Sequence, residues 1–386
     1  MLRNKIVFIV ASILMMLMLG SVYSWSIIRV SVEEAFNLSA TQSGFPYMVS
    51  LSSYALSMLI SGKLMKRFQV GVVLGGAFLF SLGLFLSSLV TTIPMLTLTY
   101  GILVGTGVGM LYGVPLYVIN QTFPNRVGFF SGLVLLGFGF SSVIMAPIIE
   151  ILLLTTNLST MFATLSFIAI VVFSFALIPL LQPITPLADR ASLPTPIHKP
   201  TFTYLYVLFL LSLISGLMMI GLTYRIGVVN YEYDGVFVTF LLTIFAIANA
   251  IARPLFGWII DRKNIFFAGT LSLSIISTSA LIAIVNQGQL TWLFALNYGV
   301  FWFGLGSWVA IAPLAVKKLF GAHNYAHLYG FLFTAYGVAA ILGTLFSGVI
   351  LDVFNSTIPL YGLILGINLL NIGVLWLLKQ STFRLK

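Results

Sequence analysis

The chain has 386 residues, of which 60% are hydrophobic and only 7% are charged, with a formal net charge of +10 and a mean hydropathy of +1.11. Soluble domains carry about 25% charged residues, so this composition excludes a water-soluble protein and predicts an integral membrane protein. The absence of cysteine excludes disulfides and thiolate metal sites, and the basic residues are dispersed over short loops, which argues against a nucleic-acid partner.

Only helices and closed barrels satisfy every backbone polar group inside a bilayer. The apolar runs of this chain are continuous rather than alternating and about 20 residues long, which predicts helices. We therefore expect an all-α membrane protein with twelve transmembrane helices, the first of them an uncleaved span rather than a signal peptide. The expected spans are 6–29, 43–62, 71–91, 94–120, 128–150, 159–181, 203–225, 236–260, 265–285, 291–316, 328–351 and 358–378.

The longest polar segment of the chain, QPITPLADRASLPTPIHKP, follows the sixth expected span. Its proline and polar residues predict a cytoplasmic linker over 182–202. The linker divides the chain into an N-terminal six-helix half, 1–181, and a C-terminal six-helix half, 203–386.

The two halves resemble each other weakly. GKLMKRF at 62–68 parallels GWIIDRK at 257–263, and the glycine pair at 105 and 107 recurs at 304 and 306. Two parallel repeats of six helices are the plan of one large class of transporters, in which the substrate site lies midway between the repeats.

The basic residues predict which side of the membrane each loop faces. With both termini in the cytoplasm, 15 of the 18 Lys and Arg residues fall on the inside, and six of the eight acidic residues fall on the outside. Lys and Arg favour cytoplasmic loops, so this bias supports the twelve-span count. Of the remaining basic residues, Arg29 and Arg225 fall outside and Arg253 falls within the eighth span.

Five segments carry a resemblance to a known family, over the whole length of the chain. The chain resembles the major facilitator superfamily, and within it the branch of the oxalate:formate antiporter and the related bacterial monocarboxylate carriers. The superfamily motif G-x-x-x-D-R is kept at Gly257–Arg262, with Asp261 as its acid, whereas Lys66 replaces the acid in the first half. The five segments are GSVYSWSI (20–27), GVGMLYGV (107–114), FPNRVGFFSG (123–132), ARPLFGWIIDR (252–262) and FGAHNYAHLYGF (320–331).

This resemblance implies a set of substrate-binding residues. Arg253 stands where the family's span-eight arginine binds the substrate carboxylate, and Tyr23 and Tyr112 match positions that line the site. The oxalate carrier has a second cation in span eleven, where this chain has Tyr336, which points to an anion with one carboxylate. Animal monocarboxylate carriers place an aspartate one turn before the arginine, where this chain has Asn249, as the bacterial branch does.

The chemistry of Arg253 can also be considered without the family. A charge near the centre of a bilayer costs roughly 2.5–3.5 kcal/mol on insertion scales. Two interpretations remain open: the side chain reaches the cytoplasmic interface, or it faces a cavity where a carboxylate substrate pairs with its planar guanidinium. Asn249 lies one turn earlier on the same face. The three tyrosines, by contrast, have core packing as an ordinary alternative role.

We therefore expect a secondary transporter that moves small monocarboxylates, such as lactate, pyruvate or formate, by alternating access. Anion exchange and proton symport both remain open. The alternatives are an exporter of drugs or other organic solutes, a transporter-like sensor, and a membrane-embedded enzyme, for which no buried acid–base pair or metal-ligand cluster is apparent. We expect no cofactor and no metal, and a monomer in the lipid bilayer of a cell membrane, most simply a prokaryotic plasma membrane.

Overall fold

The computed structural model describes residues 5–123, 127–181 and 197–383, and the regular secondary structure in these ranges is entirely helical. The chain divides into two compact units, Met1–Arg190 and Ala191–Lys386. Within the described part, eleven helical segments are long and apolar enough to cross a membrane. The second expected span, 43–62, is not among these eleven. Most of it forms the first part of a longer helix, and its membrane crossing stays a prediction.

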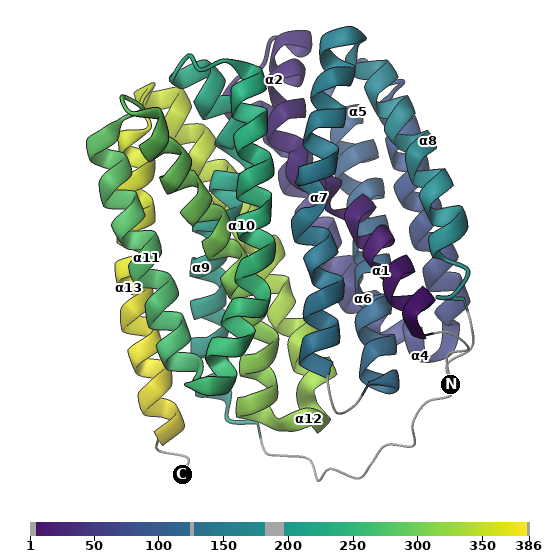
Figure 1. The fold of residues 1–386 in the computed structure, drawn as a ribbon, viewed down its shortest axis with the longest axis vertical. Helices are drawn as coiled ribbons and strands as arrows, with labels where there is room; N and C mark the ends of the chain where they lie inside the picture. Colours follow the sequence, from purple (N-terminus) through teal and green to yellow (C-terminus); the bar gives the residue numbers. More distant parts are fainter. Residues whose placement is uncertain (1–4, 124–126, 182–196, 384–386) are drawn as a thin grey trace. The chain divides into compact units, whose positions relative to one another are not determined.

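The first unit begins with one long helical segment (Figure 1). It consists of α1 (Lys5–Leu19), a 3₁₀ turn η1 (Gly20–Ser24) and α2 (Trp25–Phe36). The tighter 3₁₀ turn often marks a change of geometry inside a helix, and here it contains Tyr23. The helical segment extends seven residues beyond residue 29, where the expected first span ends, and Arg29 is part of α2.

The next two expected spans share one helix. A capping box of Ser39 and Gln42 starts the short α3 (Ala40–Ser43), and α4 (Phe45–Ser87) follows directly. Phe68 has non-helical dihedral angles (φ −132°, ψ 42°), which divide α4 into two parts. The break lies between the expected second and third spans.

Four further elements follow α5 (Ile93–Leu96) and complete the first unit. They are the π-helical η2 (Thr97–Val104), α6 (Gly105–Thr122), α7 (Val127–Thr155) and α8 (Leu158–Ala176). Helix α4 packs on α6 and α8, and α7 packs on α1. Helix α8 ends five residues before the expected end of the sixth span.

The second unit holds five long helices and a short π-helical segment. They are α9 (Lys199–Arg225), η3 (Ile226–Asn230), α10 (Gly235–Arg262), α11 (Ile265–Asn286), α12 (Thr291–Phe354) and α13 (Ile358–Phe383). Helix α12 packs on α9, α10 and α11, and it changes direction at Gly321, whose positive φ of 77° suits glycine. Since α9 begins at Lys199, the last residues of the expected linker 182–202 are helical, whereas 182–196 lie outside the described residues.

Polar side chains form hydrogen bonds or ion pairs at both ends of α10. Asp234 accepts a hydrogen bond from the Phe237 N–H (2.9 Å) at the start of α10, as N-cap residues do. At the other end, Asp261 of the G-x-x-x-D-R motif lies 3.5 Å from the Lys318 ammonium of α12. Lys318 also donates to the Ile260 carbonyl (2.8 Å), so it links the end of α10 to α12, three residues before the bend at Gly321.

In both units, glycines let two helices meet main chain to main chain. A Cβ atom at Gly109 would overlap the carbonyl oxygen of Tyr54, so α6 approaches α4 there without a side chain between them. A Cβ atom at Gly306 would overlap the carbonyl oxygen of Asn249, where α12 approaches α10. Small residues allow this close packing of helices in membranes.

Candidate functional site

Arg253 lies on the buried face of α10. Its side chain is 3% exposed, whereas its neighbours Ile251 and Leu255 face outward and are 52% and 38% exposed. The helix continues through Pro254 to Arg262. The structure therefore buries this cation and keeps it away from the outward-facing side of the helix.

Asn249 holds the Arg253 guanidinium. The Arg253 Nη2 donates to the Asn249 Oδ1 at 3.1 Å, and the Asn249 Nδ2 donates to the main-chain oxygen of Trp302 at 2.7 Å. Since a carbonyl oxygen only accepts hydrogen bonds, the Trp302 carbonyl fixes the orientation of the amide. Asn249 therefore presents its oxygen to Arg253, and both ends of its amide are engaged.

The chain of hydrogen bonds continues into α9. The indole Nε1 of Trp302 donates to the Thr223 hydroxyl (2.9 Å), and that hydroxyl donates to the Met219 carbonyl (2.7 Å). All of these polar side chains are fully buried. Sequence reasoning selected neither Trp302 nor Thr223, and the only sequence signal of Thr223 was a hydroxyl in a highly apolar span.

Tyr336 lies in the same unit, in the second part of α12. It is 1% exposed and its ring is stacked on Phe333, with 5.0 Å between centroids and an interplanar angle of 7°. The structure thus places a buried, uncharged aromatic side chain at this position.

Tyr23 and Tyr112 come together in the first unit around Phe138. Tyr23 meets the Phe138 ring edge-on at 5.1 Å, and Tyr112 does so at 5.3 Å. A third tyrosine, Tyr54, joins them, with its centroid 5.2 Å from that of Tyr112 and 6.1 Å from that of Phe138. We call these four residues the tyrosine cluster, and all four are at most 2% exposed.

The tyrosine cluster is drawn from four separate elements. Tyr23 comes from η1, Tyr54 from α4, Tyr112 from α6 and Phe138 from α7. Sequence reasoning selected two of its members from the family match but missed Tyr54. The structure brings Tyr23 and Tyr112 together through Phe138, and it brings Asn249 and Arg253 together in the other unit.

A second buried cation is Arg29, which the charge pattern assigned to the outer side of the membrane. It lies in α2 and is 1% exposed. Its Nε donates to Glu33 Oε1 (3.2 Å) and to the Ser43 hydroxyl (2.9 Å), and its Nη2 donates to the Ala40 carbonyl. The signal was available in the sequence, because a glutamate four residues after an arginine lies on the same face of a helix.

The comparison with known families covers most of the chain. The family model of the Major Facilitator Superfamily matches residues 8–344. The chain belongs to the major facilitator superfamily.

Three relatives of this major facilitator protein match it over most of their lengths. The uncharacterised MFS-type transporter YhjX of Escherichia coli is 27% identical over 88% of this chain and 86% of its own length. The oxalate:formate antiporter of Oxalobacter formigenes is 24% identical over 89% of this chain and 84% of its own length. Monocarboxylate transporter 12 of Xenopus laevis is 25% identical over 74% of this chain and 68% of its own length.

Membership of the superfamily makes the chain a multi-pass membrane transporter rather than an enzyme. Among the residues that the structure describes, no three His, Asp or Glu side chains lie together as a metal centre would need. The chemistry to be explained is therefore recognition and movement of a solute.

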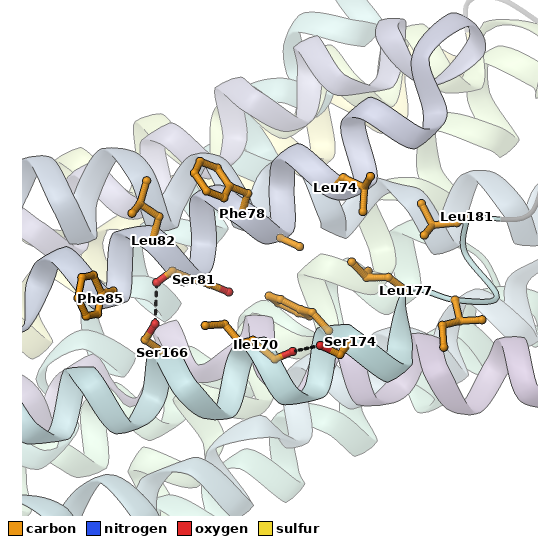
Figure 2. Close-up of a pocket in the computed structure, with 13 residues that line it drawn as sticks. Leu74, Phe78, Ser81, Leu82, Phe85, Ser166, Ile170, Ser174, Leu177 and Leu181 are labelled. Atoms are coloured by element: carbon orange, nitrogen blue, oxygen red, sulfur yellow. Dashed lines mark hydrogen bonds between the residues drawn. The ribbon is translucent and has the colours of Figure 1, made fainter.

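The apolar groove in Figure 2 does not have the chemistry of such a recognition site. It has a volume of about 510 Å³ and is lined by α4 and α8 of the first unit, with no charged residue among its lining residues. Its hydroxyls serve the helices themselves, since Ser166 donates to the Ser81 carbonyl (2.9 Å) and Ser174 to the Ile170 carbonyl (2.7 Å). Phe78 on its rim is 64% exposed, which suits contact with lipid tails.

Proposed function

We propose that this major facilitator protein is a secondary transporter of small monocarboxylates, such as lactate, pyruvate or formate, and works by alternating access. It crosses the cell membrane of a prokaryote as a monomer with twelve spans in two six-helix halves, 1–181 and 203–386. Both termini lie in the cytoplasm. The anion moves either by exchange or together with a proton.

The observation that carries this proposal is the environment of Arg253. A guanidinium that is 3% exposed within an apolar span, held by the neutral amide of Asn249, offers a fixed positive charge. The planar fork of arginine suits a carboxylate, which it binds through two parallel N–H···O bonds. We propose that Arg253 binds the carboxylate and that Asn249 orients it.

The remaining site residues supply neutral groups. Tyr23, Tyr112 and Tyr336 are buried tyrosines, each of which carries a hydroxyl that both donates and accepts hydrogen bonds. A second carboxylate would find no additional cation among them, and burying an unpaired charge is costly. The proposal therefore favours anions with one carboxylate. The names of two relatives, an oxalate:formate antiporter and a monocarboxylate transporter, support a carboxylate as the substrate.

Thermal unfolding in detergent tests the proposal. Lactate, pyruvate or formate should raise the unfolding temperature of the wild type, because a ligand that binds only the folded state stabilises it. Arg253→Gln should abolish this rise. Arg262→Gln is the matched control, since it removes an exposed cation from the end of the same helix and should leave the rise unchanged.

The protein quality of each variant is checked by gel filtration before the comparison. Arg253→Gln removes a buried charge and should fold at least as well as the wild type. If Arg253→Gln still gains stability from the same anion at the same concentration, the carboxylate does not bind at Arg253 and the proposal fails.

A further inference from the structure

Trp302 of α12 contacts two neighbouring helices of the second unit. Its main-chain oxygen accepts the hydrogen bond from the Asn249 amide of α10 (2.7 Å), and its indole donates to the Thr223 hydroxyl of α9 (2.9 Å). Its ring also lies 6.4 Å from that of Phe245, one turn before Asn249. The main chain that orients the amide therefore belongs to a residue whose side chain is fixed on a third helix.

The direction of each hydrogen bond at Thr223 is set by its partners. The Met219 carbonyl can only accept, so the hydroxyl donates to it (2.7 Å) and uses a lone pair to accept from the indole. Thr223 is fully buried. Valine has nearly the same shape as threonine but carries no hydroxyl, so a substitution by valine separates the hydrogen bond from the packing.

Trp302 differs from the other buried tryptophans in having this bond. Three tryptophans of the chain are at most 1% exposed, namely Trp25, Trp302 and Trp308. The indole nitrogens of Trp25 and Trp308 have no hydrogen-bond partner among the residues that the structure describes. The fold thus accommodates a buried indole without a partner. Of the three, the indole with a partner belongs to the residue that orients Asn249.

We infer that Thr223 is a positioning residue of the carboxylate site. It holds the indole of Trp302, whose main-chain oxygen orients the Asn249 amide, and that amide in turn holds the Arg253 guanidinium. The inference rests on the proposed function, in which Arg253 binds the carboxylate, and all four residues lie in the second unit. Two parallel bonds to a carboxylate need a defined orientation of the guanidinium, so a displaced amide weakens binding.

The test measures counterflow of labelled lactate in liposomes and takes the half-saturating lactate concentration as its readout. Thr223→Val should raise this concentration about three- to tenfold, the effect of one hydrogen bond. Thr223→Ser keeps the hydroxyl and should restore the wild-type value. A purely structural role would lower the amount of folded protein, which changes the maximal rate of uptake but not the half-saturating concentration.

Thr239→Val is the matched control. Thr239 is a threonine of the same unit that is 3% exposed, and its hydroxyl has no hydrogen-bond partner in the part of the chain that the structure describes. This variant should keep the wild-type half-saturating concentration.

Trp302→Phe breaks the same hydrogen bond from the other side and should raise the half-saturating concentration at least as much. Adding Thr223→Val to Trp302→Phe should then have no further effect, because both changes remove one interaction. The inference is overturned by a wild-type value in Thr223→Val, by a Thr223→Ser protein that behaves like Thr223→Val, or by effects of the two changes that multiply. If Thr223→Val shows no uptake, a rise of its unfolding temperature with lactate as large as that of the wild type also overturns it.

An Arg253→Gln arm separates this inference from the proposed function. If Arg253→Gln loses lactate transport while Thr223→Val keeps the wild-type half-saturating concentration, only the role of Thr223 is wrong. If Arg253→Gln transports lactate as the wild type does, the carboxylate site itself is wrong, and the inference about Thr223 falls with it.

Discussion

The Arg253 guanidinium is hydrogen-bonded to the Asn249 amide oxygen, 3.1 Å away and one turn earlier on the same helix. The amide is in turn anchored to the main chain of α12 through the Trp302 carbonyl. A neutral partner orients the cation without cancelling its charge, whereas a carboxylate in the same place would do both.

Asn249→Asp should make substrate binding weaker. The new carboxylate pairs with Arg253 and competes with the substrate, and the guanidinium beside it lowers the pKa of the aspartate. The aspartate therefore stays ionised from pH 7 to pH 5, and the loss of binding should be equally large across this range. The substrate concentration that gives half of the thermal stabilisation, measured from pH 7 to pH 5, checks this.

The wild type is the control for the Asn249→Asp titration, since the substituted position then holds an amide that does not titrate. An Asn249→Asp protein that binds lactate as tightly as the wild type at pH 7 would contradict the positioning role of Asn249.

Tyr336→Lys should shift the preference of the transporter towards dicarboxylates. A lysine at this buried position adds a second cation for a second carboxylate, which in the wild type would enter a low-dielectric site uncompensated at a cost of several kcal/mol. Competition of oxalate against labelled lactate uptake is the measurement, and Tyr336→Phe is the uncharged control. A wild type that already prefers oxalate to lactate would refute the argument from charge.

Gly306→Ala should lower both stability and substrate binding. The added methyl group would overlap the Asn249 carbonyl oxygen and approach the Ala252 Cβ at 3.0 Å, so α12 must move away from α10. Overpacking of this kind costs about 1–3 kcal/mol. The unfolding temperature in detergent measures it.

Gly366→Ala in α13 serves as the matched control for that substitution, because nothing lies within 4 Å of its new Cβ atom. It should leave the unfolding temperature unchanged or raise it slightly. Equal effects at positions 306 and 366 would show that the close approach of α10 and α12 does not matter for stability.

Glu33→Gln should destabilise the first unit, because Arg29 is 1% exposed and would keep its charge without the carboxylate. Removing one partner of a buried ion pair costs about 3–5 kcal/mol of stability. Because Glu33 is partly exposed, we expect a loss at the lower end of this range. Glu34→Gln, at an exposed neighbour, is the control. Adding Arg29→Met to Glu33→Gln should recover most of the loss; if it does not, the charge of Arg29 is not the cause.

The sidedness of the loops can be tested directly in a chain without cysteine. A cysteine at Asp234 should react with an impermeant reagent on intact cells, and a cysteine at Lys199 should react only after the membrane is opened. Both positions are exposed at helix ends. Labelling of position 199 from outside would contradict the predicted topology.

The helical architecture was predictable because a bilayer leaves few alternatives for long apolar runs. What the sequence did not reveal is where those runs bend or continue. The break at Phe68 has no proline or glycine at that position, and the extension of α2 through Arg29 to Phe36 depends on contacts with Ser43 and Ala40 that only the folded hairpin brings together.

The candidate site was predictable to the extent that charge is rare inside a membrane. Arg253 stood out for that reason, and Asn249 followed from its helical spacing. Thr223 and Tyr54 did not stand out, because one hydroxyl or one tyrosine in an apolar span has no special cost. Their roles depend on partners far away in the sequence, Trp302 for Thr223 and Phe138 for Tyr54.

The glycine contacts at Tyr54 and Asn249 carry a consequence for which substitutions the chain tolerates. At both positions the helix–helix contact is made by a main-chain oxygen, so any residue that fits the space on the other side of the helix preserves it. The atom that holds the helices together and the side chain that can vary belong to the same residue. A substitution at position 54 or 249 can therefore change the chemistry of that buried position while the neighbouring helix keeps its place.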